Sequence, residues 1–347
     1  MPNPSLTIDR IHTGLQRYFD TLRGRGCRIE RLQVMEAGHA GLTFGFELAG
    51  PSVDERRGLI LKLAPPGVRR AGNTDVYRQA PLLRTMFSAG LQVPDVPFAS
   101  EDEQWFGTAF IIMDRLAGAP FFVWQPDPAF DRSPAAVAAL WTQTIDAMIG
   151  FHRLDWRSTL GNWEAPRRLD SELAYWDPIL AKAPEPAWIT AGRSLCERLR
   201  CTLPADAPLG LVHGDCQPGN VLFDDGRLTG VIDWELASIG CRWIDVGWMM
   251  MLADRDNWPP GWRPLCPLSP AQIAARYADA MGESRDGLDW FQAFAGYRLG
   301  AIACLNVRLH RSGRRHDPTW EHFADAIPSM FERASALAAN LPRVHPT

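Results

Sequence analysis

Residues 211–235 read LVHGDCQPGNVLFDDGRLTGVIDWE, and they say more about the fold than any other stretch of the chain. Two strand-like segments, the apolar 221–223 and 231–233 with two apolar residues before Asp233, flank the sequence Asp-Asp-Gly at 224–226. A short polar turn that ends in glycine between two apolar runs is typical of a β-hairpin. The stretch therefore predicts an apolar strand, a polar loop and a hairpin in succession.

Three polar side chains stand at the ends of these expected strands. Asp215 follows the first strand in an exposed turn, Asn220 starts the hairpin and Asp233 ends it. A hairpin of this length returns its second strand beside its first, so we expect the oxygens of Asn220 and Asp233 to point at one metal ion. Phosphoryl transfer from ATP requires a carboxylate that accepts the proton of the attacking hydroxyl and oxygen ligands for Mg²⁺. Asp215 is the predicted base, and Asn220 and Asp233 are the predicted metal ligands.

The order of these residues is that of the protein-kinase catalytic loop, H-R-D-x-x-x-x-N followed by D-F-G. Here Gly214 replaces the arginine, and the later tripeptide is Asp-Trp-Glu. The pairing of H-G-D-x-x-x-x-N with I-D-W-E resembles the aminoglycoside phosphotransferase and choline-kinase-like family. That resemblance implies ATP and Mg²⁺ as cofactors, a small-molecule hydroxyl acceptor and a supporting role for His213. The alternative is that an HGD turn and an IDW strand end arise separately in a structural loop.

The resemblance covers residues 30–312. ASIGCRWIDVGW at 237–248 is similar to the family's segment after the metal aspartate, which implies that Asp245 supports the catalytic loop. YRLGAIACLNVRLHRSG at 297–313 resembles a subgroup associated with acyl-CoA dehydrogenases, as does GFHRLDW at 150–156. His152 and Asp155 are interpreted as a packed helix-end pair.

The first third of the chain predicts strands and one helix. Residues 30–48 predict two strands joined by a turn that holds Gly38 and Gly41, and 58–64 and 108–113 predict two more. A helix is expected over 74–89, although Pro81 interrupts the pattern.

The resemblance places the nucleotide site in this region. It implies that Lys62, in the middle of an apolar strand, contacts the α- and β-phosphates, and that the turn with Gly38 and Gly41 covers the phosphates. Only two lysines occur in the chain, Lys62 and Lys182. The carbonyl of Asp114 and the N–H of Leu116 are expected to pair with adenine.

One departure from the family pattern concerns the partner of the lysine. The helix after the lysine strand usually offers a glutamate to the lysine, and the corresponding residue here is Gln79. A neutral amide forms no charge-assisted pair. Asp75, one turn earlier, is an alternative partner. This departure keeps open a second interpretation, a nucleotide-binding sensor or scaffold with little transfer activity.

The rest of the chain predicts helices. Ser133 and Pro134 predict a helix start, with apolar residues at helical spacing up to His152, and 290–309 is the clearest later helix. The expected fold is α+β and bilobal, of the protein-kinase type. A small antiparallel-sheet lobe at 1–115 would bind nucleotide, and a larger helical lobe at 116–347 would hold the catalytic and acceptor sites.

Composition limits the partners. The 347 residues include 46% hydrophobic and 22% charged residues and carry a net charge of −4, which argues against a nucleic-acid partner. No apolar run is long enough for a membrane span, and the first residues lack a secretory pattern. Seven scattered cysteines without a CxxC pair favour a reducing cytoplasm.

The acceptor is less well defined. Residues 241–347 hold eleven acidic residues and twelve arginines, a balance mildly against a polycation. Six tryptophans and Met249, Met250 and Met251 in that stretch either line an apolar acceptor pocket or fill a helical core. The subgroup resemblance implies hydroxyacyl-CoA-like or other hydroxylated acceptors. The absence of an A-P-E segment argues against a protein kinase.

Overall fold

The computed structural model describes residues 7–24, 26–35, 42–50 and 56–342. The chain forms two compact units. The first comprises the chain up to Ala119 together with residues 222–224 and 229–236, and the second comprises the remainder. Gly38 and Gly41 lie outside the described residues, so their predicted role over the phosphates stays a prediction.

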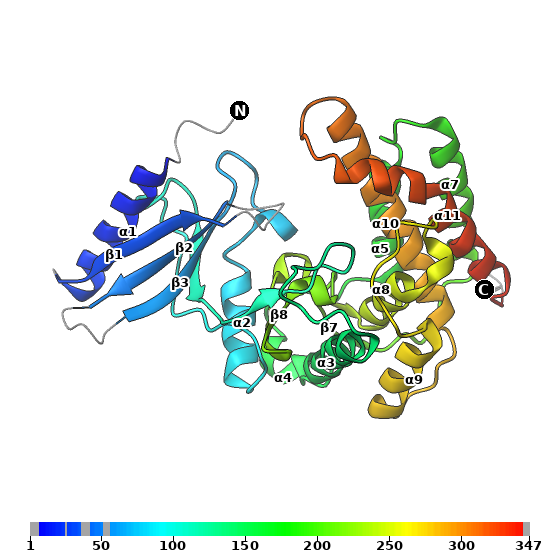
Figure 1. Ribbon diagram of the computed structural model, residues 1–347, viewed down its shortest axis with the longest axis horizontal. Helices are drawn as coiled ribbons and strands as arrows, with labels where there is room; N and C mark the ends of the chain where they lie inside the picture. Colours follow the sequence, from blue (N-terminus) through cyan, green and yellow to red (C-terminus); the bar gives the residue numbers. More distant parts are fainter. Residues whose placement is uncertain (1–6, 25, 36–41, 51–55, 343–347) are drawn as a thin grey trace. The chain divides into compact units, whose positions relative to one another are not determined.

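The described part of the first unit holds a five-stranded antiparallel sheet in the order β1-β2-β3-β5-β4 (Figure 1). The predicted strands are confirmed, with small shifts at their ends. In β3, Lys62 lies opposite Thr43 of β2 and Ile111 of β5, so it occupies an inner strand of the sheet. The strands are β1 (Arg28–Val34), β2 (Leu42–Ala49), β3 (Arg56–Leu63), β4 (Phe98–Ser100) and β5 (Phe110–Asp114).

A helix that the sequence analysis did not predict, α1 (Ile8–Arg23), precedes the sheet. The side chain of Thr7 caps it by accepting the N–H of Arg10, and Ile11, Leu15 and Phe19 recur on one face at helical spacing. These three side chains are fully buried in one cluster with apolar residues of the sheet. The periodicity and the cap were therefore readable in the sequence.

The helix expected over 74–89 is shorter than predicted. A 3₁₀ turn occupies Gly72–Thr74, and α2 runs from Gln79 to Ser88. Pro81 explains the difference, because a proline fits only the first turn of an α-helix, where its missing N–H leaves no hydrogen bond unmade.

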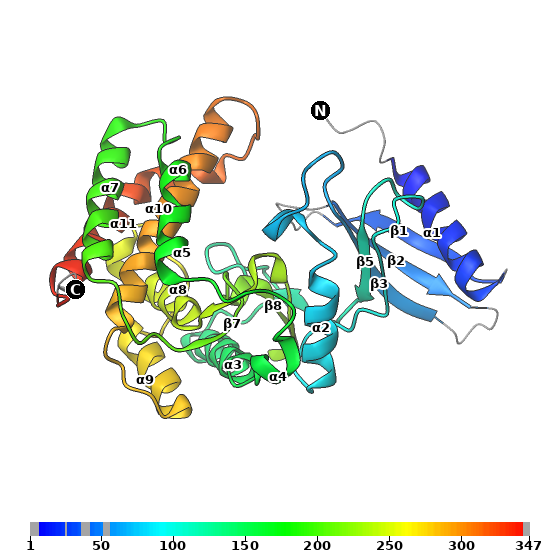
Figure 2. The same ribbon diagram turned by 180° about the vertical axis from the view of Figure 1, so that it is seen from behind.

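The second unit is mainly helical, as predicted. Ser133 and Pro134 begin the long helix α3 as expected, with the Ser133 hydroxyl accepting the N–H of Ala136 at 3.3 Å. Helices α8 and α10 pack side by side (Figures 1 and 2). The helices are α3 (Pro134–His152), α4 (Trp156–Leu160), α5 (Leu169–Tyr175), α6 (Asp177–Leu180), α7 (Pro186–Cys201), α8 (Trp243–Ala253), α9 (Pro270–Met281), α10 (Leu288–Arg311) and α11 (Thr319–Ala339).

Residues 209–241, together with β6, form two small sheets. The antiparallel pair β7 (Leu209–Val212) and β10 (Ser238–Cys241) forms one of them. The other has the order β6-β8-β9, with β6 at Ala119–Pro120, β8 at Val221–Asp224 and β9 at Arg227–Val231. The predicted hairpin is thus confirmed, but its second strand ends two residues before Asp233.

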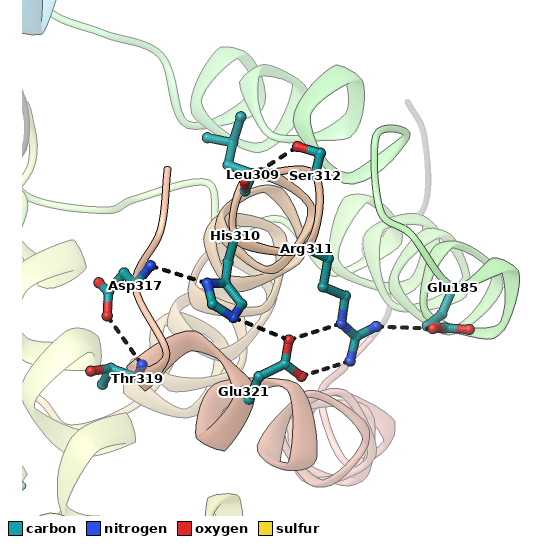
Figure 3. Close-up of polar contacts among 8 residues, drawn as sticks. All are labelled: Glu185, Leu309, His310, Arg311, Ser312, Asp317, Thr319 and Glu321. Carbon is teal, nitrogen blue, oxygen red and sulfur yellow. Dashed lines mark hydrogen bonds and ion pairs between the residues drawn. The ribbon is translucent and has the colours of Figure 1, made fainter. Parts of the chain in front are cut away.

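The turn between α10 and α11 is fixed by polar contacts (Figure 3). The Arg311 guanidinium pairs with Glu321 at 2.8 Å and with Glu185 at 3.1 Å, and Nδ1 of His310 accepts the N–H of Asp317 at 3.0 Å. These contacts link the end of α10 to α11 and to the residue before α7. The second half of the 297–313 motif therefore has a structural role.

No helix in the described ranges has the length and apolar character needed to cross a bilayer.

Candidate active site

The loop that follows β7 carries the HGD sequence. Gly214 has φ 88°, a conformation that side-chain-bearing residues rarely adopt. The N–H of Asp215 donates to Nδ1 of His213 at 3.2 Å, and His213 is fully buried. Glycine at 214 and histidine at 213 therefore shape the turn that presents Asp215.

The carboxylate of Asp215 is held by two amide side chains. Nδ2 of Asn220 donates to Oδ2 of Asp215 at 2.8 Å and also to its backbone carbonyl at 2.8 Å. Nε2 of Gln217 donates to Oδ1 at 3.0 Å. Asn220 itself lies at the end of a 3₁₀ turn, Pro218–Asn220, directly before β8. The structure thus brings Asp215 and Asn220 together, and it adds Gln217, which the sequence analysis did not single out.

Asp245, which comes later in the chain, holds the same loop in place. Its Oδ2 accepts the N–H of His213 at 2.7 Å, and its Oδ1 accepts the N–H of Gly214 at 2.8 Å. Asp245 is fully buried in the first turn of α8, where the helix dipole favours a negative charge. The support that the resemblance implied for Asp245 has a direct physical form here, because one carboxylate fixes two consecutive N–H groups.

The other partner of Asp245 is His152, at the end of α3. Nε2 of His152 lies 3.1 Å from Oδ2 of Asp245, and its Nδ1 lies 3.0 Å from the hydroxyl of Tyr277. This arrangement suits a neutral imidazole that donates to the carboxylate and accepts from the tyrosine. His152 and Asp155 thus both have structural roles, as interpreted, but not as a pair: Asp155 instead caps α4 by accepting the N–H of Ser158.

Burial sets the charge state of this pair. It lowers the pKa of His152, which keeps the ring neutral. Burial alone would raise the pKa of Asp245, but the combined influence of His152, which is hydrogen-bonded to it, and of His213 outweighs burial, and the pKa is lowered. Asp245 is therefore an ionised carboxylate that accepts three hydrogen bonds in the interior of the second unit.

In the first unit, Nζ of Lys62 lies 3.1 Å from Oδ1 of Asp233. Both side chains are largely covered, with 13% and 31% of their surface exposed. Asp233 has φ 64°, an uncommon conformation for a residue other than glycine. Backbone strain of this kind concentrates at functional sites. The structure thus pairs the predicted phosphate ligand with the predicted metal ligand.

Gln79 is not the partner of Lys62. Gln79 is 1% exposed at the start of α2, and its Nε2 has no hydrogen-bond partner within the described part of the chain. One buried oxygen of Asp75, Oδ1, likewise accepts no hydrogen bond from the residues that the structure describes.

The segment predicted to pair with adenine begins at the end of β5. The side chain of Asp114 forms two hydrogen bonds with Arg57, at 2.6 and 2.9 Å, and its N–H donates to the carbonyl of Asp95. The side chain of Leu116 covers Gly230 of β9, where an added Cβ would lie 2.2 Å from it. These contacts hold the segment in place, and the pairing of the Asp114 carbonyl and the Leu116 N–H with adenine stays a prediction.

The sequence analysis missed Arg298, although it quoted the YRLG sequence that contains it. Arg298 is 4% exposed in α10, between the rings of Trp176 and Trp248. A charged residue inside an otherwise apolar helical pattern was the available signal. Most of the expected tryptophans and Met249, Met250 and Met251 are buried, so they mainly fill the helical core.

The fold, the loop that presents the Asp215 carboxylate and the buried residues that hold this loop define a protein of the protein-kinase-like class. The model of the APH phosphotransferase enzyme family matches residues 52–294, and the chain belongs to that family.

Three curated relatives carry the name of acyl-CoA dehydrogenases. The Arabidopsis thaliana protein called probable acyl-CoA dehydrogenase IBR3 is 28% identical over 84% of this chain and 38% of its own length. Mouse acyl-CoA dehydrogenase family member 10 is 26% identical over 67% of this chain and 21% of its own length. Human acyl-CoA dehydrogenase family member 11 is 27% identical over 52% of this chain and 23% of its own length. The chain thus spans well under half the length of these relatives.

Solved structures share the fold. A candidate aminoglycoside phosphotransferase from Ralstonia eutropha JMP134 superposes with a TM-score of 0.75 at 20% identity, over 95% of this chain and 99% of that one. A thermostable mutant of aminoglycoside phosphotransferase APH(4)-Ia, in a ternary complex with AMP-PNP and hygromycin B, superposes with a TM-score of 0.61 at 17% identity. The match covers 94% of this chain and 98% of that one. Macrolide 2′-phosphotransferase MphH from Brachybacterium faecium superposes with a TM-score of 0.54 at 17% identity, over 95% of this chain and 100% of that one.

Proposed function

We propose that this protein is a kinase that uses ATP and Mg²⁺ to phosphorylate a hydroxyl group of a small molecule, with Asp215 as the base. The observation that carries the proposal is the fixation of one carboxylate in a loop held by Asn220 and Asp245. A base positioned in this way is ready to accept the proton of an attacking hydroxyl without reorganising.

Asn220 and Asp233 are the proposed Mg²⁺ ligands. The amide nitrogen of Asn220 is bonded to Asp215, which leaves its Oδ1 as a hard donor of the kind Mg²⁺ prefers. No cluster of three or more His, Cys, Asp or Glu side chains arranged for a metal occurs in the described ranges. A Mg²⁺ site in a nucleotide enzyme does not require one, because phosphates and water supply most of the ligands. The bound ion would neutralise charge on the transferring phosphoryl group.

The nucleotide is proposed to occupy the first unit. Lys62 would contact the α- and β-phosphates, the turn with Gly38 and Gly41 would cover them, and the backbone of Asp114 and Leu116 would pair with adenine. Residues 1–115 would then act as the nucleotide-binding lobe and 116–347 as the catalytic and acceptor lobe. The structure of a family member with AMP-PNP supports ATP as the donor.

A second candidate function is a nucleotide-binding sensor with little transfer activity. The observation in its favour is Gln79, a buried neutral amide where the family usually has a glutamate. Lys62 instead pairs with Asp233, which gives the lysine an anionic partner from another part of the first unit. That pairing favours the enzyme.

Thermal stability with and without Mg-ATP, followed by ADP release with a panel of hydroxylated acceptors, tests the proposal. A ligand that binds the native state raises its Tm. We expect a Mg²⁺-dependent shift and acceptor-stimulated ADP. Asp215→Asn should keep the shift and lose transfer by about 10²- to 10⁴-fold, the usual contribution of a general base. Asp206→Asn, an exposed carboxylate before β7, is the matched control.

Transfer at the wild-type rate by Asp215→Asn would remove the assigned base. A Mg²⁺-dependent shift without ADP from any acceptor would favour the sensor.

A further inference from the structure

Arg298 is the buried charge in the second unit that the proposed chemistry has not used. It extends from α10, and its Cζ lies 5.1 Å from the ring centroid of Trp176 and 4.9 Å from that of Trp248. Trp176 stands between α5 and α6, and Trp248 belongs to α8, one turn after Asp245. Two indole rings therefore flank the guanidinium within cation–π distance.

The guanidinium has no anionic partner. It makes no hydrogen bond or ion pair with any residue that the structure describes, and its Nε is buried without a partner. Other buried charges of the second unit are satisfied. Asp254, for example, accepts Nε2 of Gln292 at 2.6 Å and Nε of Arg333 at 2.8 Å. An unpaired buried charge destabilises a fold, so its retention calls for a functional explanation.

The two terminal nitrogens of Arg298 differ from Nε. They form no hydrogen bond with any residue in the described ranges, and their surface is not fully covered, so they keep access to solvent. With a tryptophan near each side, the accessible part of the guanidinium is its outer edge. That edge presents two parallel N–H groups, the geometry that binds a carboxylate or phosphate with two hydrogen bonds.

The surrounding charges place Arg298 near the proposed base. Burial lowers the pKa of Arg298, whereas the charges of Glu172, Asp215 and Asp245 raise it and that of Arg167 lowers it further. An arginine remains protonated under these influences. Asp215 is thus close enough for its charge to act on the guanidinium. The geometry agrees, because Trp248, beside Arg298, lies one turn after Asp245, and Asp245 holds the loop that carries Asp215.

We propose that Arg298 binds an anionic group of the acceptor, so that the substrate is a small hydroxylated anion, a hydroxycarboxylate or a hydroxylated phosphate ester. The inference deepens the proposed function and rests on it for the fate of the hydroxyl. A polycation such as hygromycin B, the ligand of the related APH(4)-Ia, would meet a buried positive charge at this position.

The test compares the wild-type chain with Arg298→Met, Arg298→Lys and the control Arg308→Met, which removes an exposed arginine of the same helix. Acceptors are two- to six-carbon hydroxycarboxylates beside their neutral amides, glycerol 3-phosphate beside glycerol, and hygromycin B. We expect the wild-type protein to prefer the anion of each pair. In Arg298→Met, KM for the preferred anion should rise about 10- to 100-fold with a smaller change in kcat, as expected for the loss of one charge-assisted contact made in the ground state. Arg298→Lys should lie between, and Arg308→Met should match wild type.

Binding is measured separately from turnover. The preferred anion, added without nucleotide, should change tryptophan emission saturably in the wild type and Arg308→Met but not in Arg298→Met. Comparing the hydroxycarboxylates with glycerol 3-phosphate shows whether the site binds a carboxylate or a phosphate group. Saturable anion binding without ADP would support the site while the phosphotransferase proposal failed.

Three results would overturn the inference. One is equal use of anions and neutral analogues by the wild type, with ADP formed, which would leave the phosphotransferase proposal intact. Another is an unchanged KM in Arg298→Met. The last is a preference for hygromycin B. If Arg298→Met does not fold, wild-type anion selectivity and the KM of Arg298→Lys decide.

Discussion

Replacing Asp245 with asparagine tests the support of the catalytic loop. One oxygen of the carboxylate accepts hydrogen bonds from the ring of His152 and the N–H of His213, and the other oxygen accepts one from the N–H of Gly214. An amide has one oxygen, so in either orientation its NH₂ faces a backbone N–H. One buried donor is left unpaired, and the remaining bonds lose their charge. These losses sum to about 2–4 kcal/mol of unfolding free energy. The Tm should fall by roughly 5–10 °C.

The assay joins stability to activity. Tm and kcat are measured for Asp245→Asn and for Asp254→Asn, which removes the other buried carboxylate of the α8 region, bonded to Gln292 and Arg333. Both variants should lose stability. Asp245→Asn alone should also lower kcat by more than about tenfold at a temperature where it is folded, because Asp215 is no longer held in place.

Equal losses of kcat in the two variants would refute the reasoning, since stability rather than loop geometry would then explain the effect. An unchanged Tm in Asp245→Asn would refute the hydrogen-bond argument itself.

Two further predictions concern buried titratable groups. Because burial lowers the pKa of His152 below its ordinary value of 6.5, the unfolded chain binds a proton that the folded chain does not as the pH falls through that value. Stability should therefore decrease from pH 7.5 to 5.5, by at most about 1.4 kcal/mol per pH unit from this group, and urea titrations of His152→Asn should show a shallower slope. Burial raises the pKa of Cys216 well above its ordinary value and that of Cys241 to about 12, so both thiols should resist a thiol reagent in the native protein. Cys201 is exposed and should react first, and mass spectrometry after brief labelling would contradict the argument if Cys216 were modified before Cys201.

Much of the fold follows from local patterns. Apolar runs and a glycine-containing turn predicted four strands of the first sheet, and Ser133 with Pro134 fixed the start of α3, because these signals act within a few residues. The unpredicted α1 had the same kind of signal in Thr7 and its apolar face. The start of α2 shifted because Pro81 tolerates only the first turn.

For the candidate active site too, some features follow from the sequence and others only from the tertiary structure. The sequence by itself determined the composition of the catalytic loop and the family, since the spacing of His213, Asp215 and Asn220 lies within one turn and one hairpin. Only the tertiary structure decided that Lys62 pairs with Asp233, that His152 supports Asp245 rather than pairing with Asp155, and that Arg298 is left between two tryptophans. These contacts join residues far apart in the chain, and their energies depend on burial and on which donors remain unpaired. Neither quantity exists until the helices have packed.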